Sequence, residues 1–115
     1  MKTFKDLKGL EGIDKLNECI PYVDNILLAL RNMGEVNFAE AATPMYKEHH
    51  EDFNKIFEIL NGPDAITDNT LEVLSATATI IAEIITNKEI CAFFMGACKK
   101  TRSAISATQN TKAEQ

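Results

Sequence analysis

Apolar side chains recur along this chain with the period of an α-helix, and this spacing constrains the fold more than any other feature. In the first segment they follow alternating steps of three and four residues, which places them on one helix face toward a core. Pro21 lies inside this stripe and cannot donate a backbone hydrogen bond, so we expect a kink or a break near residues 17–21. Gly34 suits the end of the helix. The stripe consists of Ile13, Leu16, Ile20, Val23, Leu27 and Leu30.

A second helix is predicted to begin at Thr43-Pro44, because threonine can cap a helix and proline is tolerated at the first helical position. It should run to about Leu60 and stop at Asn61-Gly62-Pro63. Its predicted core positions are Met45, Phe53, Ile56, Phe57 and Leu60.

A third helix is expected over residues 70–86, capped by Asp68 or Asn69, and a fourth from Asn87 through Arg102. The third helix is apolar on most sides, which is typical of the buried centre of a bundle or of a helix that a partner half covers. Its two stripes are Leu71, Leu74, Ala78, Ile81 and Ile85, and beside them Val73, Thr77, Ile80 and Ile84.

The sequence therefore predicts an all-α fold, a compact bundle of four to five helices. At 115 residues with 45% hydrophobic residues, the chain has the size and composition of one domain. We expect residues 1–98 to form this helical domain, and residues 99–115 to be a helix end followed by a flexible polar tail.

The net charge of −5 is concentrated in the middle of the chain. Residues 33–69 carry two basic and eight acidic side chains, a net of −6, whereas residues 1–32 have a net of 0 and residues 70–115 a net of +1. An acidic centre without a basic stripe argues against nucleic-acid binding. The longest apolar run, ATATIIAEIIT, is too short to span a bilayer, so we expect a soluble protein of the cytoplasm with no membrane partner.

The metal-capable side chains cluster in residues 46–53, YKEHHEDF. Ligands on one helix converge at spacings of three or four residues, but His49 and His50 are adjacent and point about 100° apart. Only Glu48 or His49 with Asp52 can converge. We interpret the segment as the solvated flank of a helix; a metal-dependent enzyme built on His49 and His50 is the less favoured alternative.

Other catalytic patterns are absent from the sequence. The five glycines are scattered, so they form no phosphate loop, and no nucleophile elbow occurs. An odd cysteine count argues against a disulfide framework, and we expect Cys19, Cys91 and Cys98 to act as small buried hydrophobes. We therefore predict that the protein is not an enzyme and uses no cofactor or metal.

Phe93, Phe94 and Met95 are consecutive, so one narrow helix stripe cannot hide all three. Either the fourth helix is wedged into the bundle, or part of this cluster contacts an apolar partner or a second subunit.

Two stretches carry a resemblance to a known family. Residues 4–27, FKDLKGLEGIDKLNECIPYVDNIL, combine an aromatic residue with D-L-K-G-x-E-x-I-x-x-L and an amphipathic run that contains proline. Residues 57–94 combine an I-L-N-G turn, a capped L-x-x-L helix and N-K-E-I-x-x-F-F. Together they resemble the small tail assembly chaperones of long-tailed bacteriophages and prophages of Gram-positive bacteria. Residues 37–53 do not take part in the resemblance.

The resemblance implies an all-helical, non-enzymatic protein of the bacterial host cytoplasm. Such a chaperone binds the long, apolar tape measure protein during tail assembly and is absent from the mature virion. A frameshifted longer form would recruit the tail tube protein. Two other readings stay open at this point: self-association as a homo-oligomer, and a small regulatory module that dimerises through the third and fourth helices.

Overall fold

The structure, a computed structural model, describes residues 1–34, 37–63 and 68–104. In these ranges the chain forms a 3-10 turn, η1 (Phe4–Asp6), and the helices α1 (Gly9–Met33), α2 (Phe38–Asn61), α3 (Thr70–Thr86) and α4 (Lys88–Ala97). Residues 99–104 are helical as well, and none of the described residues lies in a strand. The predicted all-α bundle is confirmed.

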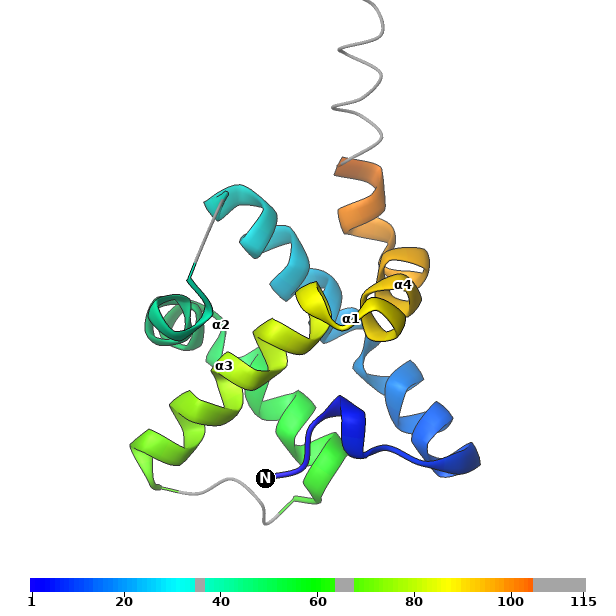
Figure 1. The fold of residues 1–115 in the computed structure, drawn as a ribbon, viewed down its shortest axis with the longest axis horizontal. Coiled ribbons are helices and arrows are strands. Elements are labelled where there is room, and N and C mark those ends of the chain that lie inside the picture. Colours follow the sequence, from blue (N-terminus) through cyan, green and yellow to red (C-terminus); the bar gives the residue numbers. More distant parts are fainter. Residues whose placement is uncertain (35–36, 64–67, 105–115) are drawn as a thin grey trace, which may run out of the picture.

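The helices enclose one core. α2 packs against both α1 and α3, and α4 packs against α3 and α1 (Figure 1). All five apolar positions predicted for the second helix are buried. The largest fully buried side chains come from all four helices and include Val23, Ile26, Phe53, Ile56, Phe57, Ile80, Ile81, Ile84 and Phe94.

α1 continues unbroken through Pro21, so the predicted break is wrong. Proline removes the hydrogen bond to the carbonyl four residues earlier, which belongs to Asn17. Both Asn17 and Pro21 are exposed, so water can satisfy that carbonyl. The second half of the predicted stripe is buried, but Ile13 in the first half is 52% exposed.

α2 begins six residues before the expected start at Thr43-Pro44, which is therefore wrong. Asn37 caps the helix, because its side-chain oxygen accepts hydrogen bonds from the backbone N–H groups of Ala39 and Glu40 at 3.0 and 3.3 Å. Pro44 lies inside the helix, and the helix is kinked at His49, where φ is −125° and ψ is 28°.

The predicted ends of α1 and α2 are confirmed. Gly34 follows α1 with a φ of +75°, and Gly62 follows α2 with a φ of +99°. Glycine adopts such left-handed conformations without the steric cost that a β-carbon brings.

Asparagine caps start the last two helices: Asn69, one of the two predicted candidates, and Asn87, as predicted. Asn69 accepts from the backbone N–H of Glu72, and Asn87 accepts from that of Ile90, both at 3.1 Å. The fourth helix does not continue to Arg102, however. It ends at Ala97, and Cys98 has extended backbone angles before helical residues 99–104 begin.

Asp24 is a buried carboxylate on α1, and it caps the start of the helical residues 99–104, which lie more than 70 positions later in the sequence. Its oxygens accept hydrogen bonds from the backbone N–H groups of Lys100 (3.0 Å) and Thr101 (2.9 Å) and from the hydroxyl of Thr101 (2.8 Å). Burial by itself raises the pKa of Asp24, but these donors and the charge of Lys100 outweigh burial and lower it below its usual value.

Replacing Asp24 should therefore destabilise the protein at neutral pH. Asp24→Asn leaves buried donors poorly matched, and we expect it to lower the free energy of unfolding by about 1–3 kcal/mol in urea titrations. The pKa of the Asp24 carboxyl is lower in the folded than in the unfolded protein. The extra stability of the wild type is therefore present above the unfolded pKa of about 4, and it is lost as the pH falls through the folded pKa. Glu18→Gln, an exposed change on the same helix, should have little effect. If the difference in the free energy of unfolding between Asp24→Asn and the wild type does not change as the pH is lowered, this role of Asp24 is contradicted.

Glu83, a second buried carboxylate, lies on α3 and holds the N-terminal segment. Its oxygens accept hydrogen bonds from the Thr3 hydroxyl at 2.8 Å, the Phe4 backbone N–H at 3.0 Å and the Lys5 backbone N–H at 3.3 Å. These bonds position Phe4 in the core, where its ring lies 5.1 Å from the ring of Phe94.

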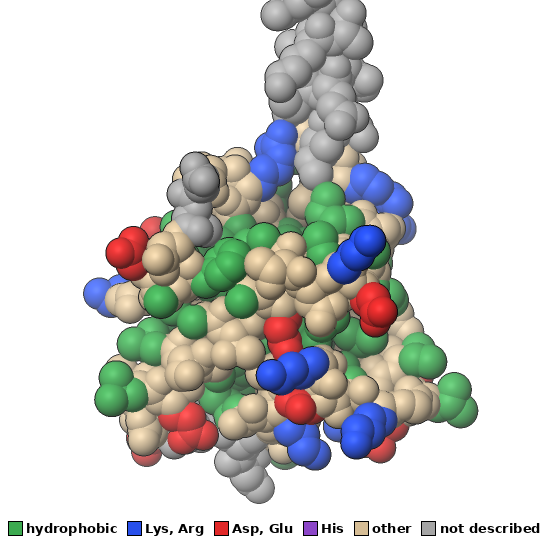
Figure 2. Space-filling view, in the orientation of Figure 1, with side chains coloured by type: hydrophobic (Ala, Val, Ile, Leu, Met, Phe, Trp, Pro, Cys, Tyr) green, Lys and Arg blue, Asp and Glu red, His purple; other side chains and the backbone are tan. Residues whose placement is uncertain are grey.

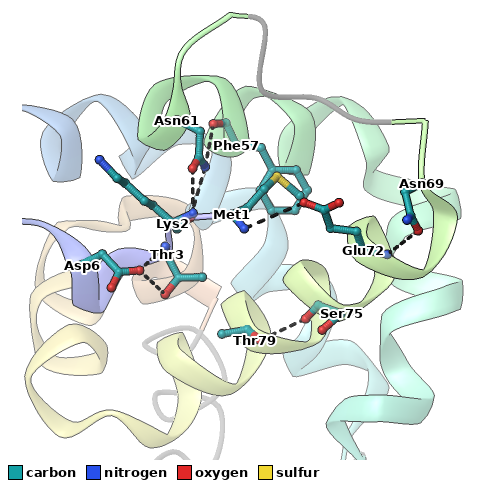
Figure 3. Close-up of polar contacts among 10 residues, drawn as sticks. All are labelled: Met1, Lys2, Thr3, Asp6, Phe57, Asn61, Asn69, Glu72, Ser75 and Thr79. Carbon is teal, nitrogen blue, oxygen red and sulfur yellow. Dashed lines mark hydrogen bonds and ion pairs between the residues drawn. The ribbon is translucent and has the colours of Figure 1, made fainter.

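The first two residues make further contacts to α2 and α3 (Figure 3). The Lys2 backbone N–H donates to the side chain of Asn61 at 2.6 Å, and that side chain donates back to the Lys2 carbonyl at 3.2 Å. The N-terminal amine of Met1 lies 4.0 Å from the carboxylate of Glu72. The segment thereby bridges the end of α2 and the body of α3.

Glu83→Ala should release this segment, because three donors lose their acceptor. We expect a loss of about 2 kcal/mol in the free energy of unfolding and faster amide hydrogen exchange at Phe4 and Lys5. Glu72→Gln is the matched control on the same helix, since its contact to the amine is exposed and weak. Unchanged exchange at Phe4 in the Glu83 variant would contradict the assignment.

Candidate functional site

The histidine and carboxylate segment, residues 46–53, is only partly the solvated flank that the sequence predicted. Lys47, Glu48, His50 and Glu51 are exposed, but His49 and Asp52 are half-buried. α2 is kinked at His49, and Asp52 just beyond the kink contacts Asn25 of α1, which helical periodicity does not reveal.

A chain of polar contacts starts at His49. Its Nδ1 lies 3.6 Å from one carboxylate oxygen of Asp52, and the other oxygen accepts from the Asn25 side chain at 3.1 Å. The Lys100 ammonium donates to the carbonyl oxygen of the same Asn25 side chain at 3.2 Å. These contacts join α1, α2 and the helical residues 99–104.

This polar chain lies in a groove that also has apolar walls, formed by Leu28, Ala29 and Met33. Within the described ranges, no group of three or more histidine, cysteine, aspartate or glutamate side chains is placed to hold a metal ion. The pairing of His49 with Asp52 agrees with the spacing argument; Glu48 also lines the groove.

The cysteines are free thiols. Cys19 and Cys98 are buried and Cys91 is half-buried, in line with the predicted role as small hydrophobes for the first two. Burial, together with the nearby charges of Glu18 and Asp24, raises the pKa of Cys19 and of Cys98 to about 12. Both thiols are therefore protonated at neutral pH and unsuited to act as nucleophiles.

The predicted partner-binding cluster on α4 is divided by the fold. Phe94 is fully buried, with its ring 5.1 Å from the rings of Phe4 and Phe93. Phe93 and Met95 pack against the core and are half-buried. Only Phe93 and Met95 can therefore present surface to a partner, and their role in binding stays a prediction.

A larger apolar surface lies on the outer face of α3. Five side chains fall within about 80° of the helix circumference, calculated at 100° per residue. Leu71 is 79% exposed, Ile85 is 38% exposed, and the three between them are half-buried. Figure 2 shows hydrophobic side chains along α3 and the neighbouring start of α2. We call this surface the α3 stripe; it consists of Leu71, Leu74, Ala78, Ala82 and Ile85.

Beside the α3 stripe runs a shallow groove between α3 and the start of α2. Its walls are Phe38 and Ala39 on one side and Ala78, Thr79 and Ala82 on the other. The hydroxyl of Thr79 donates to the Ser75 carbonyl at 3.0 Å, so it needs no external partner. Small side chains allow the backbone of a second helix to approach closely.

The sequence identified this surface only in part. The first of the two predicted stripes contained Ile81, which is buried, and lacked Ala82, and neither stripe was assigned to the outside. Both predicted stripes of the third helix are mainly apolar, and all four residues of the one with Val73, Thr77, Ile80 and Ile84 are buried.

Searches of protein-family models, of curated proteins and of solved structures found no match to this chain. Among the helices of the described residues, none combines the length and the hydropathy that crossing a membrane requires.

Proposed function

We propose that this protein is a phage tail assembly chaperone, a binding protein that shields an apolar helical segment of the tape measure protein during tail assembly. The observation that carries the proposal is the α3 stripe: an apolar helix face that runs the length of α3 and stays accessible in the folded protein. Apolar surface of this kind on a folded domain marks an interaction site.

The geometry suits a helical client. From Leu71 to Ile85 the α3 stripe extends about 21 Å, the length of roughly four helical turns. The large residues stand at its two ends, and Ala78 and Ala82 lie between them, so a client helix can lie close to α3 over its centre. Recognition of an apolar helix face by a groove is a common binding mode and needs no catalytic group.

The sequence resemblance supports the same proposal, since its second stretch, residues 57–94, contains all of α3. In this proposal the protein acts in the cytoplasm of the bacterial host and leaves before the virion is complete. A longer, frameshifted form would add contacts to the tail tube protein. Several copies along one client would increase the overall affinity through multivalency.

Charged side chains introduced into the α3 stripe should abolish binding of the tape measure protein. We expect Leu71→Asp combined with Ala78→Arg to remove the gain in soluble tape measure protein that co-expression with the wild-type chain gives. Both side chains are accessible, and aspartate near a helix N-terminus is favourable, so the variant should keep its helical circular dichroism.

Leu10→Asp is the matched control, because Leu10 is equally exposed and also occupies the second position of its helix. It should leave the soluble yield of the client unchanged. Absence of any gain with the wild-type chain would refute the proposal. The α3 stripe could instead be the interface of a regulatory dimer. In that case the double variant will have a lower molar mass than the wild type in light scattering, and co-expression with the wild type will not change the soluble yield of the tape measure protein.

A further inference from the structure

The most exposed large apolar side chain of the described residues lies far from α3 in sequence, at the start of α1. Leu10 is 82% exposed, and Ile13, one turn later on the same helix face, is 52% exposed. Leu7 and Leu16 flank them and are half-buried. Four large apolar side chains within ten residues therefore form one accessible patch.

Next to Leu10 the surface is hollowed. A groove runs between the N-terminal segment and α1, and its lining is apolar apart from Lys8. Gly12 forms part of the floor: a β-carbon there would lie 3.1 Å from Leu7, so glycine allows the segment to cross the helix closely. The complete lining is Phe4, Leu7, Lys8, Gly9, Leu10, Gly12, Ile13 and Leu16.

The charges on the two sides of this patch have opposite signs. Lys8 lies on the groove side. On the other side of Leu10, at about 40° and 100° around the helix, follow Asp14 and Glu11, both exposed. Glu11 is paired with the ammonium of Lys15 at 3.3 Å, so the acidic character of this edge rests on Asp14. The patch thus has a groove with a basic edge on one side and a projecting leucine with an acidic edge on the other.

We propose that a second copy of this chain occupies the groove, so that the protein forms a two-fold symmetric dimer through the start of α1. A rotation of 180° about an axis along α1 exchanges the two sides of the patch. Leu10 of each copy then enters the groove of the other, and the acidic edge of each copy meets the basic edge of its partner.

Self-complementarity of this kind is what a two-fold interface requires, since the same surface must serve both copies. A different partner of a single charge sign would match one edge and be repelled by the other. The second copy matches both edges and supplies the apolar side chain that fills the groove.

This dimer is independent of the proposed client binding, because the α3 stripe belongs to a different helix and shares no residue with the patch. Each surface can therefore be altered while the other is left intact.

Sedimentation and light scattering of the full chain test the proposal. The wild type should change from monomer to dimer mass as its concentration rises from about 1 to about 100 µM. Leu10→Asp should raise the dissociation constant by roughly a hundredfold or more, because each dimer loses two buried leucine side chains. Leu71 is the second residue of α3, as Leu10 is of α1, and it is similarly exposed. Leu71→Asp should therefore leave the dissociation constant of the dimer unchanged.

Exchanging the charges of the basic and acidic edges tests how the two copies are oriented in the dimer. Lys8→Glu and Asp14→Lys should each weaken the dimer by about two- to fivefold, because each places like charges across the interface. Together they should restore wild-type affinity, since the two edges are again opposite in sign. A monomeric wild type, a dimer that survives Leu10→Asp, or a double variant weaker than both single variants would overturn the proposal.

Discussion

The fold depends on a constraint that applies to any buried carboxylate: its oxygens must receive enough hydrogen bonds to replace water. Asp24 and Glu83 satisfy it in the same way, each with donors from a short segment distant in sequence. Asp24 holds residues 99–104, and Glu83 holds the N-terminal segment together with Phe4. Among the described residues no buried side-chain nitrogen or oxygen lacks a partner. Two buried carboxylates thus fix two segments that are distant from them in sequence.

Fixing the N-terminal segment also shapes the surfaces available for binding. With Phe4 anchored against Phe94, Leu7 lies against Gly12 and forms a wall of the groove beside Leu10. The α3 stripe has a different origin: α3 is apolar on most sides, and the bundle covers only the side that faces α2, α4 and η1. One surface therefore depends on an anchored segment, and the other on a helix with more apolar area than its neighbours can bury.

Local signals predicted the helices well and their interruptions poorly. Asn69, Asn87, Gly34 and Gly62 act within one helical turn, so their effects were readable from the sequence. Thr43-Pro44 was misread because the same pair is compatible with a helix start and with a helix interior whose lost hydrogen bond faces water. The kink at His49 and the interruption at Cys98 have no comparable local signal. Near both, the chain contacts α1: Asp52 accepts from Asn25, and the Cys98 thiol lies 3.9 Å from the Ile20 carbonyl.

The sequence by itself determined the helical class and the core positions of α2, because the periodicity of apolar residues along one helix decides these properties. Only the tertiary structure decided which stripe of α3 stays accessible, that Phe94 is buried while Leu10 is exposed, and that Asp24 and Glu83 are interior groups. These properties depend on which elements lie opposite each other. Pairing between residues almost 80 positions apart leaves no periodic trace in the sequence.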